Sequence, residues 1–565
     1  MSAPEKRAVT SPAAEPRSSP GGRGGARRSL GAALALGALL PAAATADVAA
    51  PADDLFERFE VVIGAERYQT VLTGFFLGGA VADVAVVSVD EDEGRLVRIY
   101  AFGEGGWAEK VDAALRPGVS FVDVAGIGGR ERLITHEPGR LSWFDPDSAT
   151  ERVLVEVATS YNPTPAGLRY GDGEPAGPVD EGEIPHLDVA RDVNGDGRDD
   201  LILPDLEGFR VLVQKRDGGF AAPVRLGPPE PFRDAIARGA RRSYGEVGIS
   251  ALTAPWYLGR MHEVDYDRDG RGDLVFWHED QFDVHYQDAD GLFDPVAETF
   301  TTGVAFDSDG AYSLLFGLGD AGTMRLILGL RASSRRTVLH SFRDLNGDRV
   351  ADLVTLSLEG RSLLRQRSLY EVHFGAPAPG GTSFAREAGT AIRPPGGQPW
   401  GYSAAWFEDF DGDGQVDFAF GRVRTGIGGM IRALLGGSLG MDLELYRGAD
   451  GLYPDRATVR RRITTDFDPR GGRDAGFFPA VLVGDVSGDG RSDLLVGKSR
   501  EELHVYLGVP GPELLASAPR ALAVTVPGDE RNSWLVDLDR DGKQDLLMHH
   551  PSATEPHRLT VLMAR

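Results

Sequence analysis

The chain has 565 residues, of which 42% are hydrophobic and 26% charged, so it can bury a large core and is not disordered by composition. Its formal net charge of −25 argues against nucleic acid as a partner, because phosphate contacts need clustered Lys and Arg. The absence of cysteine excludes disulfides, thiolate metal sites and a cysteine nucleophile.

Residues 1–46 have the pattern of an export signal. A basic flank ending in Arg27-Arg28 precedes the apolar run 30–40, and Ala44-Thr45-Ala46 supplies a small-x-small cleavage site. The apolar run is too short to span a membrane, and no other stretch approaches about 18 apolar residues. We therefore expect an exported protein (periplasmic, cell-surface or secreted) without a membrane span. The alternative is a long N-terminal tail that stays in the cytoplasm.

The remaining residues, 47–565, have the composition of turn-rich β structure, with 74 glycines and 35 prolines. The first strand candidates are residues 59–63 and 68–72. Residues 74–158 then hold two degenerate repeats, at 75–87 and 122–134, in which the apolar, turn, acidic, apolar order remains. We expect hairpins without metal at both.

Residues 186–565 hold six copies of an acidic loop, of which Asp409-Phe-Asp-Gly-Asp-Gly-Gln-Val-Asp417 is the clearest. Each copy places oxygen-bearing side chains at positions 1, 3, 5 and 9 and, in five copies, Gly at position 6. The candidate metal ligands are Asp192, Asn194, Asp196 and Asp200; Asp265, Asp267, Asp269 and Asp273; Asp344, Asn346, Asp348 and Asp352; Asp409, Asp411, Asp413 and Asp417; Asp485, Ser487, Asp489 and Asp493; and Asp537, Asp539, Asp541 and Asp545.

Alternating oxygens in a tight loop converge on one point, which suits a hard cation such as Ca²⁺ that takes about six to eight oxygens. The loops differ from an EF-hand, because position 12 is never the bidentate Glu: it is Leu203, Phe276, Thr355, Phe420, Val496 or Met548. The competing interpretation is a plain hairpin turn, since Asp and Gly favour turns. Six repetitions of the same acidic frame favour calcium, with up to six ions bound.

A short apolar run follows position 9 in every copy, which indicates a strand, so each loop is expected to join two strands. A second strand pair usually follows, giving four strands per repeat. We predict an all-β propeller of eight four-stranded blades, with seven as the alternative and with loop inserts at 161–184, 228–256, 308–336 and 422–468. The last repeat has room for one further strand at 558–563, so its missing outer strand is expected from residues 59–72.

The repeated Asp-x-Asp-x-Asp-Gly-x-x-Asp-Leu loop resembles the FG-GAP or VCBS repeat, which is also found in the N-terminal propeller of integrin α subunits. The resemblance covers residues 186–550 strongly and 74–186 weakly. It implies a propeller with calcium in the blade hairpins. Two copies depart from the pattern, with Arg349 at position 6 and Ser487 at position 3, and we expect these to be the weakest sites.

The sequence contains no motif typical of a catalytic nucleophile or a nucleotide-binding loop, so we predict no catalytic residue and no organic cofactor from it. We therefore expect a monomeric binding, structural or adhesion-type protein whose partner is an unidentified protein or carbohydrate. The alternative is a calcium-dependent enzyme of the lyase type that acts on polysaccharide. Release of unsaturated sugars from uronate polymers would distinguish the enzyme from the binding protein.

Overall fold

A computed structural model describes residues 50–51, 54–90, 92, 94–157, 184–205, 208–227, 246–249, 252–253, 261–278, 281–306, 335–359, 367–394, 398–399, 405–423, 437–468, 476–552 and 554–565. Contacts divide the chain into Met1–Ala46 and Asp47–Arg565, and all the described residues belong to the second unit. The expected export signal at residues 1–46 lies outside the described residues.

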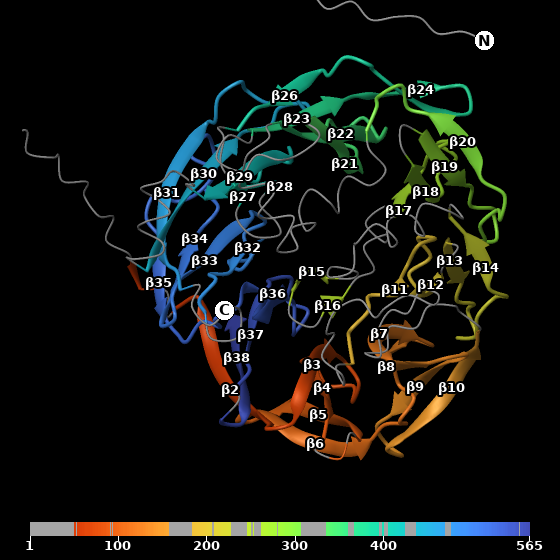
Figure 1. Cartoon of the computed structure of the whole chain (residues 1–565), viewed down its shortest axis with the longest axis vertical. Coiled ribbons are helices and arrows are strands. Elements are labelled where there is room, and N and C mark those ends of the chain that lie inside the picture. The colour runs from red at the N-terminus through yellow and green to blue at the C-terminus, as the bar shows by residue number, and fades with distance from the viewer. Residues whose placement is uncertain are drawn as a thin grey trace, which may run out of the picture. The chain divides into compact units, whose positions relative to one another are not determined.

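The second unit is a β-propeller of eight four-stranded antiparallel blades (Figure 1). Blade 1 consists of β3 (Arg67–Gly74), β4 (Asp83–Val89), β5 (Arg95–Gly103) and β6 (Gly106–Ala114), and blade 2 of β7 (Phe121–Ile127), β8 (Arg130–Glu137), β9 (Arg140–Asp145) and β10 (Thr150–Glu156). Blade 3 consists of β11 (Ala190–Arg191), β12 (Asp200–Asp205), β13 (Gly208–Leu212) and β14 (Val224–Leu226), and blade 4 of β17 (Met261–Val264), β18 (Asp273–His278), β19 (Gln281–His285) and β20 (Glu298–Thr301).

Blades 5 to 8 continue the ring. Blade 5 consists of β21 (Arg335–Arg343), β22 (Asp352–Glu359), β23 (Arg367–His373) and β26 (Thr390–Ile392). In blade 6 the first strand is in two pieces, β27 (Gln398–Pro399) and β28 (Ala405–Glu408), which both pair with β29 (Asp417–Val423); β30 (Ser438–Tyr446) and β31 (Val459–Asp466) follow. Blade 7 consists of β32 (Val481–Gly484), β33 (Asp493–Ser499), β34 (Glu502–Tyr506) and β35 (Arg520–Ala523), and blade 8 of β36 (Ser533–Val536), β37 (Asp545–His550) and β38 (His557–Ala564) with β2 (Phe56–Gly64).

The second strands of blades 1 and 3 to 8 each carry an apolar run, because both faces of the strand are covered by neighbouring blades. In β4, Val84 and Val86 pack in one core cluster, whereas Ala85 and Val87 pack in the next. Successive side chains of a strand point to opposite faces, so a continuous apolar run serves two interfaces at once. This explains the apolar run after each acidic loop.

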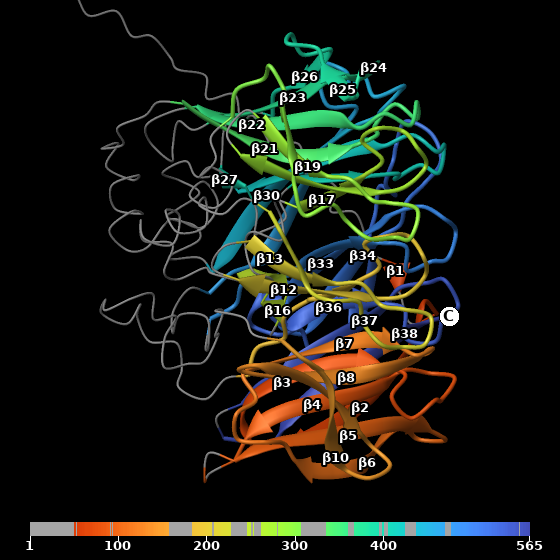
Figure 2. The same cartoon turned by 90° about the vertical axis from the view of Figure 1, so that its right-hand side faces the viewer.

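The N-terminal strand β2 completes the last blade. It lies beside β38 (Figures 1 and 2) and pairs with it antiparallel, with Phe59 opposite Val561 in the register. The prediction that a strand from residues 59–72 completes the last blade is therefore confirmed for residues 59–63. The second candidate, 68–72, instead lies in β3 and begins blade 1. Closure leaves no unpaired edge between the first and last blades.

The two degenerate repeats form the expected hairpins, β3 with β4 and β7 with β8. One predicted insert is wrong. Residues 438–446 and 459–466, expected in a loop, are the third and fourth strands of blade 6. Three consecutive arginines, Arg460 to Arg462, lie on β31, where Arg460 Nε is 3.3 Å from Glu444 and Arg462 Nε is 3.5 Å from Asp442. Arg460 and Arg462 thus pair with acids of β30, whereas Arg461 between them donates to the backbone carbonyl oxygens of Leu515 and Ser517.

The other inserts fall mainly outside the described residues: 161–183, 228–245 and 308–334 are not described. Within 228–256 the short strands β15 (Glu246–Ile249) and β16 (Leu252–Thr253) pair with each other. Three other short elements are β1 (Ala50–Pro51), which pairs with β35, and the hairpin of β24 (Gly375–Ala378) and β25 (Gly381–Phe384).

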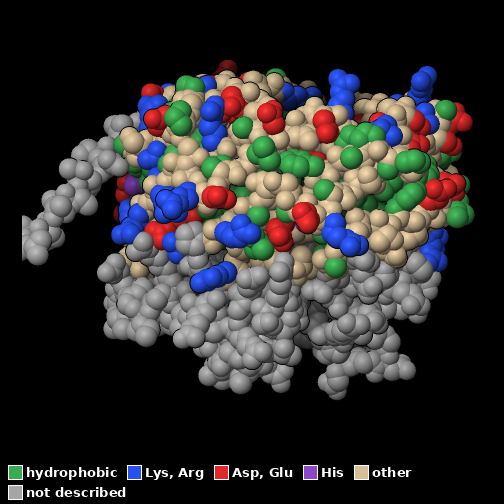
Figure 3. All heavy atoms as spheres, turned by 90° about the horizontal axis from the view of Figure 1, so that it is seen from above, with side chains coloured by type: hydrophobic (Ala, Val, Ile, Leu, Met, Phe, Trp, Pro, Cys, Tyr) green, Lys and Arg blue, Asp and Glu red, His purple; other side chains and the backbone are tan. Residues whose placement is uncertain are grey.

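Among the described residues, no helix is long and apolar enough to cross a membrane. One short 3₁₀ helix, η3 (Glu530–Asn532), precedes blade 8's first strand. On the face shown in Figure 3, basic and acidic side chains are interspersed.

Candidate metal-binding loops

All six acidic loops occupy the same place in the fold. Each joins the first and second strands of its blade, from blade 3 to blade 8, and position 9 is the first residue of the second strand. Topological equivalence puts the six loops on the same rim of the ring. The expectation that each loop joins two strands is confirmed.

The position-9 aspartates form a buried link between the loop and the blade. Asp200, Asp352, Asp417 and Asp493 are 0% exposed, and Asp273 and Asp545 are 1% exposed. In every copy Oδ1 accepts a hydrogen bond of 2.7–3.0 Å from a backbone N–H at the end of the third strand. In blades 4 to 8, Oδ2 also accepts one from the residue at position 2. This carboxylate therefore joins three segments of its blade.

Burial makes the charged form of these carboxyl groups costly. It raises the pKa of Asp200 and Asp417 to about 7, and the pKa of Asp273, Asp352, Asp493 and Asp545 to about 6. The backbone N–H donors lower these pKa values, and neighbouring loop aspartates raise them further. A divalent cation beside them would favour the ionised form.

Positions 1 and 5 organise the turn itself. The carboxylate at position 1 accepts the N–H of position 6 at 2.7–3.1 Å, and the carboxylate at position 5 accepts the N–H of position 7 at 2.8–3.0 Å. Position 6 has a positive φ in every copy, including 67° at Arg349. Arg349 thus adopts the left-handed backbone that favours glycine, at an energetic cost to the blade 5 loop.

Three loops bring three carboxylates together. The groups are Asp265, Asp267 and Asp269; Asp409, Asp411 and Asp417; and Asp537, Asp539 and Asp545, with one oxygen from each residue within 4.8 Å of the others in its group. Oδ1 of Asp265 and of Asp537 is buried without a hydrogen-bond partner, as is Oδ2 of Asp200 in the blade 3 loop. A buried carboxylate oxygen without a donor is costly, and a bound cation would remove that cost.

The described residues of the other three loops show no such group, and in each the carboxylate at position 3 is replaced. Asn194 and Asn346 accept the N–H of position 5 with their side-chain oxygens, at 3.1 and 2.9 Å. Ser487 Oγ donates to Asp485 Oδ1 at 3.3 Å. The serine hydroxyl thus contacts the position-1 carboxylate of its own loop.

Basic side chains beside position 5 are a feature that sequence reasoning missed. In blades 3, 4 and 7 the arginine at position 7 (Arg198, Arg271 or Arg491) pairs with the position-5 aspartate, and in blade 8 Lys543 Nζ lies 2.7 Å from Asp541. In blade 6, position 7 is Gln415, and Arg447 from the end of β30 replaces the missing charge. The Arg or Lys at position 7 was visible in four loops of the sequence, whereas Arg447 required the fold.

Comparisons with known proteins add little beyond the fold. No protein-family model and no curated protein matches the chain. Solved structures that are similar to it include Sqt1 of Saccharomyces cerevisiae (7% identity, TM-score 0.36, covering 90% of this chain and 98% of that one). Another is the V. cholerae biofilm matrix protein Bap1 (10% identity, TM-score 0.26, covering 88% of this chain and 76% of that one). A third is the WD40 domain of SCAP from fission yeast (10% identity, TM-score 0.25, covering 78% of this chain and 96% of that one). Likeness at this level carries no argument about function.

Proposed function

We propose that this chain is an exported calcium-binding propeller of the FG-GAP or VCBS type, which acts as a binding or structural module. Calcium would be held in the hairpin loops of blades 3 to 8 by the side chains at positions 1, 3, 5 and 9. Its role would be to stabilise the blades, because an ion that binds only the folded chain shifts the folding equilibrium.

The buried, unpartnered Oδ1 atoms of Asp265 and Asp537 are the observation that carries the proposal. Each lies in a loop where three carboxylates come within 4.8 Å, which suits an oxygen-seeking cation. The donor set contains carboxylates, amides and a hydroxyl, with neither thiolate nor imidazole, so it favours Ca²⁺ over zinc or copper. The blade 4 and blade 8 loops are accordingly the strongest candidates.

Export would place the loops where calcium is abundant. Extracellular calcium modules commonly have dissociation constants of about 10⁻⁴ to 10⁻³ M. The partner would be a protein or carbohydrate outside the cytoplasm, bound by a monomer.

Isothermal calorimetry on residues 47–565 tests the proposal. We expect calcium to bind in the micromolar to millimolar range, and magnesium to bind more weakly because it needs stricter octahedral geometry. A D265N/D537N double variant should lose two sites while keeping the fold, as shown by circular dichroism. Equal calcium uptake by the variant and the parent would exclude these two loops.

A further inference from the structure

A polar cavity of about 460 Å³ lies between blades 4 and 5. Its floor is one face of blade 5, with Thr337 on β21, Thr355 on β22, and Glu371 and His373 on β23. The backbone at 303–305, which follows β20, forms the opposite wall. Its volume falls within the range of about 300–1,000 Å³ that small-molecule sites occupy.

The cavity coincides with a change in the repeat. Position 12 of the acidic loop frame is apolar in the other five blades, as Leu203, Phe276, Phe420, Val496 or Met548, each no more than 1% exposed. Blade 5 has Thr355 there, also 1% exposed. A side chain with a hydroxyl group thus replaces an apolar one at this place between the blades.

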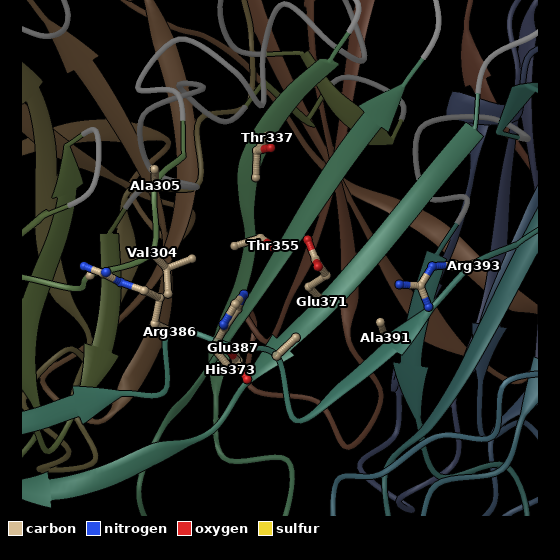
Figure 4. A pocket seen from close by; sticks show the side chains of 12 residues that line it. Val304, Ala305, Thr337, Thr355, Glu371, His373, Arg386, Glu387, Ala391 and Arg393 are labelled. Atoms are coloured by element: carbon tan, nitrogen blue, oxygen red, sulfur yellow. The ribbon is translucent and has the colours of Figure 1, made fainter.

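Polar groups extend from Thr355 across the sheet. Glu371 lies opposite Thr355 in register and Ala391 lies opposite Glu371, so the three residues share one row. Figure 4 shows the Glu371 side chain extending toward Thr355, with Arg386 and Arg393 on opposite sides of the two residues in this view. Hydrogen-bonding groups from several segments thus face one space.

The basic groups of the cavity are available to a ligand. Arg386 and Arg393 are exposed, and no residue in the described part of the chain forms an ion pair or side-chain hydrogen bond with either. His373 Nδ1 lies 2.9 Å from the carbonyl oxygen of Ala385. A carbonyl can only accept, so Nδ1 carries the hydrogen and Nε2 is left for a ligand.

We propose that this cavity binds a hexuronate unit, that is, a sugar ring bearing a carboxylate. Arginine suits the carboxylate because its guanidinium donates in a planar fork. The Thr355 hydroxyl and the His373 ring suit sugar hydroxyls. The lining residues include no phenyl or indole ring on which a neutral sugar would stack. Charge recognition therefore dominates over apolar contact.

This inference deepens the proposed binding role and rests on it, but it does not depend on calcium. Its residues are separate from the candidate ligands at positions 1, 3, 5 and 9. Calcium uptake is measured by calorimetry with the ion, whereas sugar binding is measured with the sugar in calcium and again in EGTA. The calcium proposal and the sugar proposal can therefore fail separately, because each is tested by its own binding measurement.

The test is ligand-observed NMR and calorimetry on residues 47–565, with glucuronate and galacturonate as probes. For a ligand of this size we expect a dissociation constant of ~1 mM. The R386A/R393A double variant should weaken binding at least about tenfold, because charge-assisted hydrogen bonds are lost. The matched control is R367A, which removes an exposed arginine elsewhere on β23.

A second variant keeps the proposal testable if the arginine changes disturb the loop at 386–388. T355V restores an apolar residue like those of the other blades, so it should fold and yet bind uronate more weakly. Glucose has the sugar ring without the carboxylate, and acetate has the carboxylate without the ring. Each should therefore bind more weakly than glucuronate. Binding of glucose or acetate as tight as that of glucuronate, or unchanged binding by R386A/R393A, would overturn the assignment.

Discussion

Arg447 Nε donates to Asp411 Oδ2 across 2.6 Å, and its Nη2 lies 2.7 Å from Asp413 Oδ2. This arginine, at the end of β30, thus supplies a positive charge to the acidic loop of blade 6. Any calcium ion in that loop would share these two carboxylates with the guanidinium.

The R447M variant should therefore have opposite effects with and without calcium. In EGTA the thermal midpoint should fall, because the loop aspartates lose their counter-charge. Calcium should bind this loop several-fold more tightly, because it no longer competes with the arginine. Thermal unfolding with a calcium titration checks both effects. R456M, which removes an exposed arginine in blade 6, serves as the control.

Asp417 and Asp413 should separate the structural role of the loop from its metal role. D417N replaces a carboxylate that accepts from the backbone N–H groups of Phe410 and Gly448. Its amide nitrogen cannot accept, so we expect a loss of about 1–3 kcal/mol of unfolding free energy even in EGTA.

D413N, at the exposed position 5, should change stability by less than about 0.5 kcal/mol in EGTA but reduce stabilisation by calcium. Urea unfolding in EGTA and in calcium gives the comparison. Equal losses for the two variants in EGTA would show that position 9 has no separate structural role.

The closure of the ring can be tested within β2. Ile63 is 0% exposed and packs in the core with Leu547 and Leu559 of blade 8, whereas the adjacent Val62 is 60% exposed. I63A should lower the unfolding free energy by about 2–5 kcal/mol, because it leaves a cavity between blades 8 and 1. V62A should change it by no more than about 0.5 kcal/mol. A negligible effect of I63A in urea unfolding would argue against closure by β2.

Buried histidines predict that the fold weakens in acid. Burial lowers the pKa of His136 to about 4, and its Nδ1 lies 2.8 Å from Ser120 Oγ. The unfolded chain therefore takes up this proton near pH 6.5, while the folded chain takes it up only near pH 4. His136 thus stabilises the fold above pH 6.5 and loses that contribution, at most about 3 kcal/mol, as the pH falls to 4.

The H136Q variant isolates this effect, because all the other titrating groups are the same in both proteins. Its free energy of unfolding should fall less steeply than that of the parent between pH 6.5 and 4. Identical slopes in urea unfolding at several pH values would contradict the assignment.

The repeat made the fold predictable from the sequence. Acidic loops followed by apolar runs located the first two strands of six blades, and the unpaired strand at 558–563 indicated that β2 would close the ring. The error at 438–466 has a physical cause. The strands β30 and β31 there carry charged residues such as Glu444, Arg460 and Arg462, which pair with acids or bases of the neighbouring strand. In the sequence alone, such charged residues are typical of a solvated loop.

The candidate site was predictable only in part. The four ligand positions follow from spacing alone, but the contact of Arg447 with Asp411 joins residues far apart in the chain. The cavity of blade 5 likewise depends on which strands lie in register. Its single clue in the sequence is Thr355, which stands where the other copies carry an apolar side chain.

The most direct test of the central claim is the thermal midpoint of residues 47–565 in saturating calcium and in EGTA, with metal analysis of the purified protein. Bound calcium stabilises only the folded chain, so we predict a midpoint several degrees higher in calcium and more than one calcium ion per chain. An identical midpoint in both buffers, together with protein free of bound metal, would contradict calcium binding in these loops.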